Sequence, residues 1–141
     1  MGEALKSLGV LERGHVVEVQ RNDLVAGYIG QTAAKTQKAI DAAMGGVLFI
    51  DEAYSLLSVA IGNDFGREAI KTLLTATETH RNAFVVIAAV YPLQMQQLMD
   101  SNPGMSSRFV NKFNFEDYHP QELQAISVKS HPSATPFCVQ E

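Results

Sequence analysis

The fold of this chain is decided by residues 46–52, which read Gly46-Val-Leu-Phe-Ile-Asp51-Glu52. Four bulky apolar residues in a row suit a strand that is buried on both faces, as the strands of parallel sheets are. Two adjacent carboxylates follow this strand directly. Because the chemistry of parallel α/β sheets takes place at the carboxyl ends of the strands, Asp51 and Glu52 are the first candidates for a functional site.

The same stretch matches the Walker B pattern of nucleotide hydrolases. In that role Asp51 holds Mg²⁺, directly or through water, and Glu52 orients or deprotonates an attacking water. A second interpretation stays open, in which a core strand ends in a solvated Asp-Glu turn and the two acids have no catalytic role.

Apolar runs and helical spacing alternate along the rest of the chain. We expect strands at residues 15–19, 47–50, 84–89 and 112–115, and helices at residues 32–44, 64–79 and 92–101, with a further helix beginning at Pro120. Either Asn63 or Asp64 is expected to cap the second of these helices. The alternation predicts an α/β fold, a three-layer sheet of parallel strands, with one domain over residues 1–126 and a poorly ordered tail over residues 127–141.

The composition excludes several classes of function. The chain has 141 residues, a net charge of −4 and scattered Lys and Arg, so neither a nucleic acid nor an anionic membrane is expected as its partner. No apolar run approaches the ~20 residues that cross a bilayer. The single cysteine agrees with a reducing compartment, and we expect a cytoplasmic protein.

Several motifs lie in a fixed order at consistent spacing. They are residues 8–19, residues 23–33 (Asp-Leu-Val-Ala-Gly-Tyr-Ile-Gly-Gln-Thr-Ala), residues 45–54 (Gly-Gly-Val-Leu-Phe-Ile-Asp-Glu-Ala-Tyr) and residues 101–109, with Ser-Asn-Pro-Gly before Ser-Arg-Phe. Together they resemble one branch of the AAA+ ATPases. This branch holds the red-type rubisco activases, the stage V sporulation protein K family and the ATPase subunits of type VII secretion. The resemblance covers roughly residues 4–126.

This resemblance implies further site residues. Tyr28, Ile29 and Gly30 match the first pore loop of the family, which grips a threaded polypeptide; the other interpretation is a surface turn with a half-buried tyrosine. Arg108 matches a position where an arginine reaches the γ-phosphate bound by a neighbouring subunit, and a surface salt bridge is the alternative there. The resemblance also implies ATP and Mg²⁺ as cofactors, a homo-oligomeric, hexameric ring and a protein substrate.

One motif of the family is absent from the sequence. An AAA+ protein cradles phosphates in a loop of the form G-x-x-x-x-G-K-[ST], and this chain contains no Gly-Lys pair. By the resemblance, Met1 falls inside the helix after that loop, so the P-loop NTPase sheet is expected to be partial and to lack its first central strand. Two functions follow: a core piece of an ATP-driven protein-remodelling motor, or a truncated, inactive relative that serves as an interaction protein or has no independent function.

Overall fold

A computed structural model describes residues 2–57, 65–116, 119 and 122–123 of the chain. The chain divides into two compact units, Met1–Asn111 and Lys112–Glu141. The first unit holds the sheet, the helices packed on it and all of the candidate site residues.

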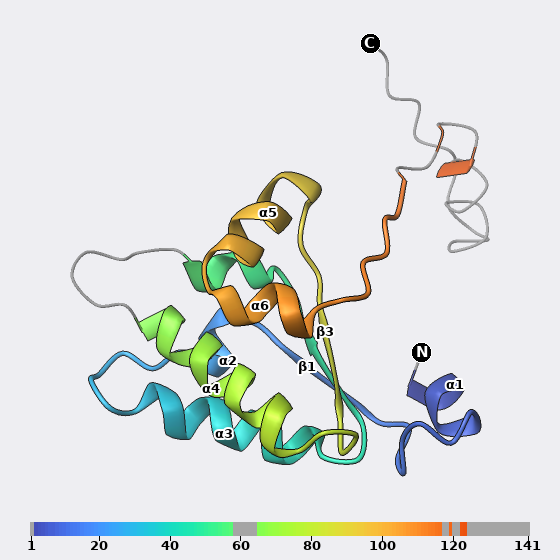
Figure 1. Cartoon of the computed structure of the whole chain (residues 1–141), viewed down its shortest axis with the longest axis horizontal. Helices are drawn as coiled ribbons and strands as arrows, with labels where there is room; N and C mark the ends of the chain where they lie inside the picture. The colour runs from blue at the N-terminus through green and yellow to red at the C-terminus, as the bar shows by residue number, and fades with distance from the viewer. Residues whose placement is uncertain (1, 58–64, 117–118, 120–121, 124–141) are drawn as a thin grey trace, which may run out of the picture. The chain divides into compact units, whose positions relative to one another are not determined.

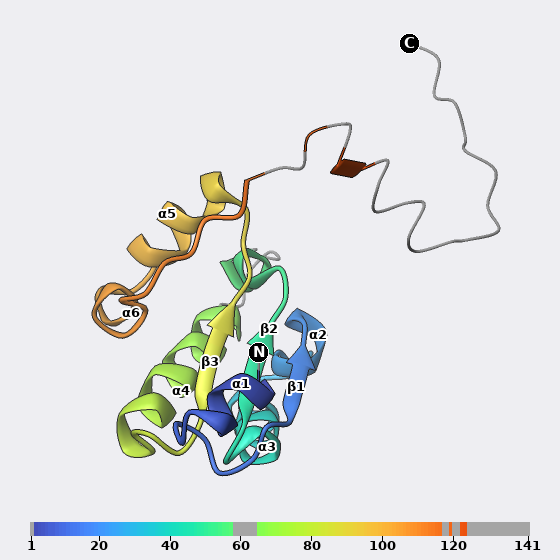
Figure 2. The same cartoon turned by 90° about the vertical axis from the view of Figure 1, so that its right-hand side faces the viewer.

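The sheet has three parallel strands in the order β1 (Val16–Val19), β2 (Val47–Ile50) and β3 (Val85–Ala88). The register pairs Val19 with Ile50 and Ile50 with Ala88. All three strands therefore end at the same level, and the residues that follow them meet at one edge of the sheet (Figure 1, Figure 2). The prediction of an α/β fold with parallel strands is confirmed.

The long helices pack on one face of this sheet. Helices α3 (Thr32–Ala43) and α4 (Phe65–Thr79) lie on one face and pack on each other, whereas α1 (Gly2–Ser7) lies on the opposite face (Figure 1, Figure 2). The central strand β2 is the most buried of the three because it has a neighbour on each side, and Leu48 is fully buried. The side chains of the main core are Val19, Leu24, Ile40, Ala43, Leu48, Ile50, Ala53, Leu56, Ala69, Ile70, Leu73, Leu74, Ala76, Phe84, Leu98, Met99 and Met105.

The predicted long helices agree with the observed ones at their ends. Helix α3 begins at Thr32 as expected and stops at Ala43, one residue early, before Gly45, whose φ of +79° suits a residue without a Cβ. Helix α4 ends at Thr79 as expected, and its buried side chains recur every three or four residues. The caps proposed for it, Asn63 and Asp64, lie outside the described residues.

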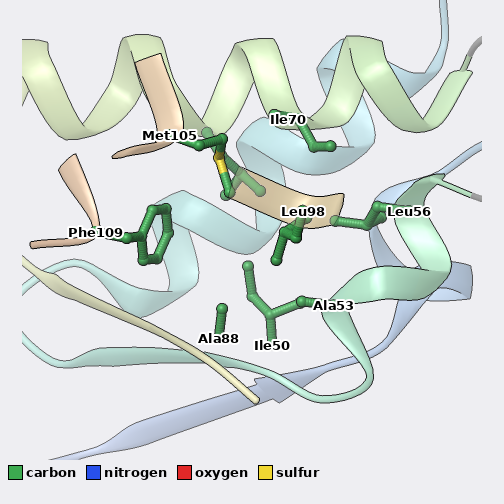
Figure 3. A pocket seen from close by; sticks show the side chains of 9 residues that line it. Ile50, Ala53, Leu56, Ile70, Ala88, Leu98, Met105 and Phe109 are labelled. Atoms are coloured by element: carbon green, nitrogen blue, oxygen red, sulfur yellow. The ribbon is translucent and has the colours of Figure 1, made fainter. Parts of the chain in front are cut away.

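Three short helices close the core beyond the carboxyl ends of the strands. They are η1 (Ala53–Leu57), α5 (Pro92–Asp100) and α6 (Pro103–Arg108). Figure 3 shows the small cavity that remains between them, α4 and the sheet, with a volume of about 20 Å³. Its lining is wholly apolar: Ile50, Ala53, Leu56, Ile70, Leu73, Ala88, Leu98, Met105 and Phe109. A cavity of this size without polar partners is a packing defect of the core and not a ligand site.

Two helices form where the sequence analysis predicted neither a helix nor a strand. The polar residues before Val25 form α2 (Arg21–Leu24), because the Gln20 N–H donates to the Asp23 carboxylate at 2.9 Å and so caps this single turn. The Asn-Pro-Gly that ends α5 also begins α6, because the Asn102 side chain accepts a hydrogen bond from the Gly104 N–H at 2.8 Å.

The predicted edge strand at residues 112–115 is wrong. These residues have no strand structure, and Phe113 and Phe115 are 79% and 84% exposed. Alternation of apolar and polar residues specifies two faces but supplies no partner, and a strand forms only beside another backbone. In the same unit Glu122 and Leu123 are helical, while Pro120 and the tail at 127–141 lie outside the described residues. The domain boundary expected at residue 126 also lies outside them and stays a prediction.

None of the helices that the structure describes is both long and apolar enough to cross a bilayer.

Candidate active site at the carboxyl ends of β2 and β3

The segments that follow β2 and β3 line an open pocket of about 300 Å³. It is lined by Asp51, Glu52, Tyr54, Ala89, Val90 and Tyr91. The parallel register places Ile50 beside Ala88, so the residues after each strand necessarily emerge next to each other. The two acids singled out in the sequence therefore lie in a pocket at the edge of the sheet where parallel α/β proteins bind ligands.

Backbone hydrogen bonds hold the turn that carries the two acids. The Asp51 N–H donates to the Val19 carbonyl at 2.9 Å, and the Ala53 N–H donates to the Ala89 carbonyl at 3.0 Å. The strand is thus tied to both of its neighbours up to the point where the acids begin. Asp51 is half-buried and Glu52 is exposed, so both carboxylates remain accessible from the pocket.

Glu52 has a backbone conformation that is unfavourable for its residue type. Its φ is +48°, in the left-handed region, and its N–H donates to the Asp51 carboxylate oxygen Oδ1 at 3.0 Å. A residue with a Cβ costs about 1–2 kcal/mol in this region, and such strain gathers at functional sites where a side chain must point in a particular direction. The strained turn therefore favours a functional role for Glu52 over a simple solvated loop.

Two tyrosines, Tyr54 and Tyr91, also line the pocket. The rings of Tyr54 and Tyr91 lie with centroids 6.2 Å apart at 49°, a tilted arrangement that aromatic pairs favour. Loss of hydration raises the pKa of the Tyr54 phenol above its usual value, and the charges of Glu52, Tyr91 and Asp51 raise it further. The phenol of Tyr54 therefore keeps its proton to a higher pH than a free tyrosine does.

The pocket suits a divalent cation better than a free anion. Asp51 and Glu52 supply carboxylate oxygens, the ligands that Mg²⁺ prefers, and the pocket has room for the water molecules that Mg²⁺ keeps. No cationic side chain is among the residues that line it. Within the described ranges no three His, Cys, Asp or Glu side chains cluster as a metal site, so Mg²⁺ would be held here by Asp51 and water, together with oxygens of a ligand.

The predicted pore loop connects α2 to α3 and lies apart from this pocket. Tyr28 is 74% exposed and Ile29 is 82% exposed, so the tyrosine is not the half-buried turn residue of the alternative interpretation. Gly30 has a φ of +79°, which a residue with a Cβ would adopt only with strain. The pair of large apolar side chains is thus displayed to solvent on a glycine-flanked loop.

Arg108 ends α6 and does not line the pocket. Its guanidinium forms an ion pair with Glu78 of α4, and its Nη1 donates to the Gly104 carbonyl at 3.1 Å. Its Nε is buried and has no partner within the described part of the chain. The salt-bridge alternative is therefore realised within this chain, while the arginine-finger role stays a prediction.

The structure thus brings Asp51 and Glu52 together and leaves Arg108, Tyr28 and Ile29 elsewhere on the fold. It adds Tyr54 and Tyr91 to the site, and the sequence analysis gave neither a role. A signal for both was present, since each follows a predicted strand by only a few residues and parallel strands deliver such positions to one edge.

Comparison with known proteins matches this architecture to one family. A family model described as "ATPase family associated with various cellular activities (AAA)" matches residues 4–117. The chain is 49% identical over 127 residues to "Protein CbxX, chromosomal" of Cupriavidus necator, covering 90% of this chain and 40% of that protein. It is 48% identical over 126 residues to "Ribulose bisphosphate carboxylase/oxygenase activase, chloroplastic" of Cyanidioschyzon merolae, covering 89% of this chain and 43% of that protein. A third relative, "Protein CfxQ homolog" of Galdieria sulphuraria, is 48% identical over 128 residues, covering 91% of this chain and 42% of that protein.

The chain spans less than half the length of these curated relatives. The match nevertheless takes in β1, β2, β3, the pocket and the exposed loop, which is most of the described structure. Among the relatives are a protein named as a ribulose bisphosphate carboxylase/oxygenase activase and proteins named as CfxQ homologues. On the basis of the family model, which matches most of its length, the chain belongs to the AAA family of ATPases.

Proposed function

We propose that this chain carries the water-activating acids and the substrate-gripping loop of an ATP-driven protein-remodelling motor. The single observation that carries the proposal is the placement of Asp51 and Glu52 at the carboxyl end of the central strand, in a pocket shared with the end of β3. Membership in the AAA family supports the assignment of ATP and Mg²⁺ to this pocket.

Each acid has its own part in hydrolysis. Asp51 is half-buried and its Oδ1 already accepts the Glu52 N–H, which restrains the carboxylate. Its second oxygen would hold Mg²⁺, directly or through water. Glu52 is more exposed and acts on the attacking water, orienting it or accepting its proton. Bound Mg²⁺ would neutralise the charge of the phosphate oxygens.

The phosphates need contacts that the pocket itself does not supply. Its lining holds two acids and no cation, and the sequence contains no Gly-Lys pair. A triphosphate near Asp51 and Glu52 would therefore meet like charge unless backbone N–H groups and a lysine of a phosphate loop surround it. We expect that the 141 residues alone bind Mg·ATP weakly.

The roles proposed for the exposed loop and for Arg108 depend on a ring of subunits. Tyr28 and Ile29 are proposed to grip an extended polypeptide through ring and methyl contacts, which their exposure of 74% and 82% supports. Arg108 is proposed to reach the γ-phosphate held by an adjacent subunit, a step in which it exchanges Glu78 for phosphate oxygens. A hexameric ring of identical subunits is the assembly in which these roles combine.

The substrate of this motor is proposed from the relatives alone. One of them is named as an activase of ribulose bisphosphate carboxylase/oxygenase, so that enzyme is the first protein to test. The name of the same relative places it in the chloroplast, and a cytoplasmic location for this chain stays a prediction.

A chimaera tests the proposed function. Residues 4–117 of this chain replace the matching segment of the Cupriavidus necator protein, which supplies the remainder of a full-length ATPase. Glu52→Gln in this chimaera is expected to bind ATP and leave it unhydrolysed, because the amide cannot take a proton from water. Glu12→Gln, at an exposed acid far from the pocket, serves as the matched control and is expected to hydrolyse ATP at the parental rate. Equal hydrolysis by the Glu52→Gln chimaera and the parent would overturn the assignment.

A further inference from the structure

The exposed 25–31 loop has a base that is held much more firmly than its tip. In Figure 1 this loop connects α2 to α3. At its beginning, the Ala26 N–H donates to the Thr32 hydroxyl at 3.1 Å, and the Thr36 hydroxyl donates to the Leu24 carbonyl at 2.9 Å. Both hydroxyls belong to the first turns of α3, so side chains of this helix bind backbone groups of the loop base.

A lysine of the same helix adds a third contact. The Lys35 ammonium donates to the carbonyl oxygens of Val25, at 3.1 Å, and Asn22. These carbonyls belong to α2 and the residue that ends it, and one cation therefore ties the last turn of α2 to α3. Hydrogen bonds from a charged group are about twice as strong as those between neutral groups.

The burial of the two threonines shows that these contacts are specific. Thr32 and Thr36 have 0% exposed surface, and no other polar or charged residue in the described part of the chain is fully buried. A buried hydroxyl costs free energy unless it is hydrogen-bonded, and each of these finds its partner in the backbone at the base of the loop. Apolar residues of the same size would fill the space equally well but would leave the Ala26 N–H and the Leu24 carbonyl without partners.

The tip of the loop has no comparable support. Tyr28 and Ile29 are the exposed residues, and a Cβ added at Gly27 or Gly30 would meet no atom within 4 Å. The Gln31 N–H donates to the Tyr28 carbonyl at 3.4 Å, a long contact within the loop. The structure thus combines a fixed base with an open tip.

We propose that Thr32, Lys35 and Thr36 form a loop anchor, a set of positioning residues that fixes where Tyr28 and Ile29 are presented and makes the loop base follow α3. Helix α3 also packs on β1, β2 and α4. The anchor therefore joins the loop to the helix that lies against the strand of the acidic pocket. The functional part of this inference rests on the proposed role of the loop in gripping a polypeptide, whereas the anchoring itself does not.

Amide hydrogen exchange of the 141-residue chain tests the anchor directly. In Thr32→Val the Ala26 amide is expected to exchange about tenfold faster than in the parent, because it loses its acceptor. Thr32→Ser keeps the hydroxyl and is expected to restore the slow exchange. Thr75→Val removes an exposed hydroxyl that bonds only within α4, to the Lys71 carbonyl, and is the matched control expected to leave the loop unchanged.

A second variant covers the case in which Thr32→Val fails to fold. Lys35→Met removes the ammonium from an exposed side chain and is expected to accelerate exchange of the 25–31 amides while the amides of β2 stay slow. If neither variant changes the exchange of the loop more than Thr75→Val does, the anchor is wrong, whatever the loop binds.

The chimaera separates the anchor from the function of the loop. Fluorescein-labelled casein, a polypeptide without stable structure, serves as the probe. Both the apparent KM for casein and kcat are measured. Lys35→Met is expected to raise KM about fivefold because the loop is no longer pre-organised. Suppose that Lys35→Met exchanges its loop amides faster, but that both Lys35→Met and Tyr28→Ala keep the parental KM for casein. This result would refute the gripping role of the loop and the functional part of the proposal, whereas the anchoring of the loop base would stand.

Discussion

Replacing Glu52 by glycine is expected to stabilise the chain while it removes a proposed catalytic group. The φ of Glu52 is +48°, which costs a residue with a Cβ about 1–2 kcal/mol and costs glycine nothing. The greater entropy of glycine in the unfolded chain offsets about 0.5–1 kcal/mol of this gain. The carboxylate of Glu52 is exposed, so its removal loses little packing. We therefore expect Glu52→Gly to raise the free energy of unfolding by about 0.5–1 kcal/mol, or the Tm by about 2–4 °C.

Urea and thermal unfolding of the 141-residue chain measure this effect, and Asn82 supplies a matched control. Asn82 has a φ of +67°, and asparagine tolerates the left-handed region better than glutamate does. Asn82→Gly is therefore expected to change stability by less than Glu52→Gly. In the chimaera, Glu52→Gly is expected to abolish ATP hydrolysis, a gain of stability at the expense of function. A Glu52→Gly chain that is less stable than the parent would refute the reasoning that the turn is strained.

Three further outcomes are expected. Tyr28→Ala in the chimaera should lower casein remodelling to background, whereas ATP hydrolysis should fall no more than a few fold because the loop does not line the pocket. A parallel loss of both activities would mean that Tyr28 is structural. Glu52→Gln should lower the pKa of the Tyr54 phenol because it removes a negative charge that disfavours the phenolate. Ultraviolet titration of the phenolate, with Tyr54→Phe as the reference, measures this pKa, and an unchanged value would place Glu52 away from the ring. Glu78→Gln should lower the stability of the chain by less than about 1 kcal/mol, since the Glu78 side chain of the pair with Arg108 is 55% exposed; a larger loss in urea unfolding would make the pair a structural element of the core.

The parts of the fold that could be predicted from the sequence are those with a strong period or a long apolar run. Strand β2 and both acids were placed correctly because four consecutive apolar residues between Gly46 and Asp51 allow little else. Helix α3 was placed to within one residue because its apolar stripe is regular and Gly45 ends it. The three-strand parallel order agrees with the expectation of a partial sheet.

The parts that could not be predicted depend on single hydrogen bonds or on a partner strand. Helix α2 is only four residues long and is capped by Asp23, a residue that also suits a turn. The alternation at residues 112–115 gave no information about whether a neighbouring backbone exists. Thr36 lies on the buried face of α3, and its hydrogen bond to the Leu24 carbonyl depends on tertiary structure. A pair of threonines four residues apart on a core-facing stripe is the signal that would have indicated the anchor.

We propose that Asp51 and Glu52 act on nucleotide through Mg²⁺ and water, while the phosphate contacts come from a phosphate loop. Calorimetric titration with Mg·ATP tests it most directly, on the 141-residue chain and on the chimaera in parallel. We expect no saturable binding below about millimolar for the chain, because two carboxylates and no cation line its pocket, and saturable micromolar binding for the chimaera. Micromolar binding of Mg·ATP by the 141-residue chain, or a chimaera that binds no better than the chain, would contradict the account.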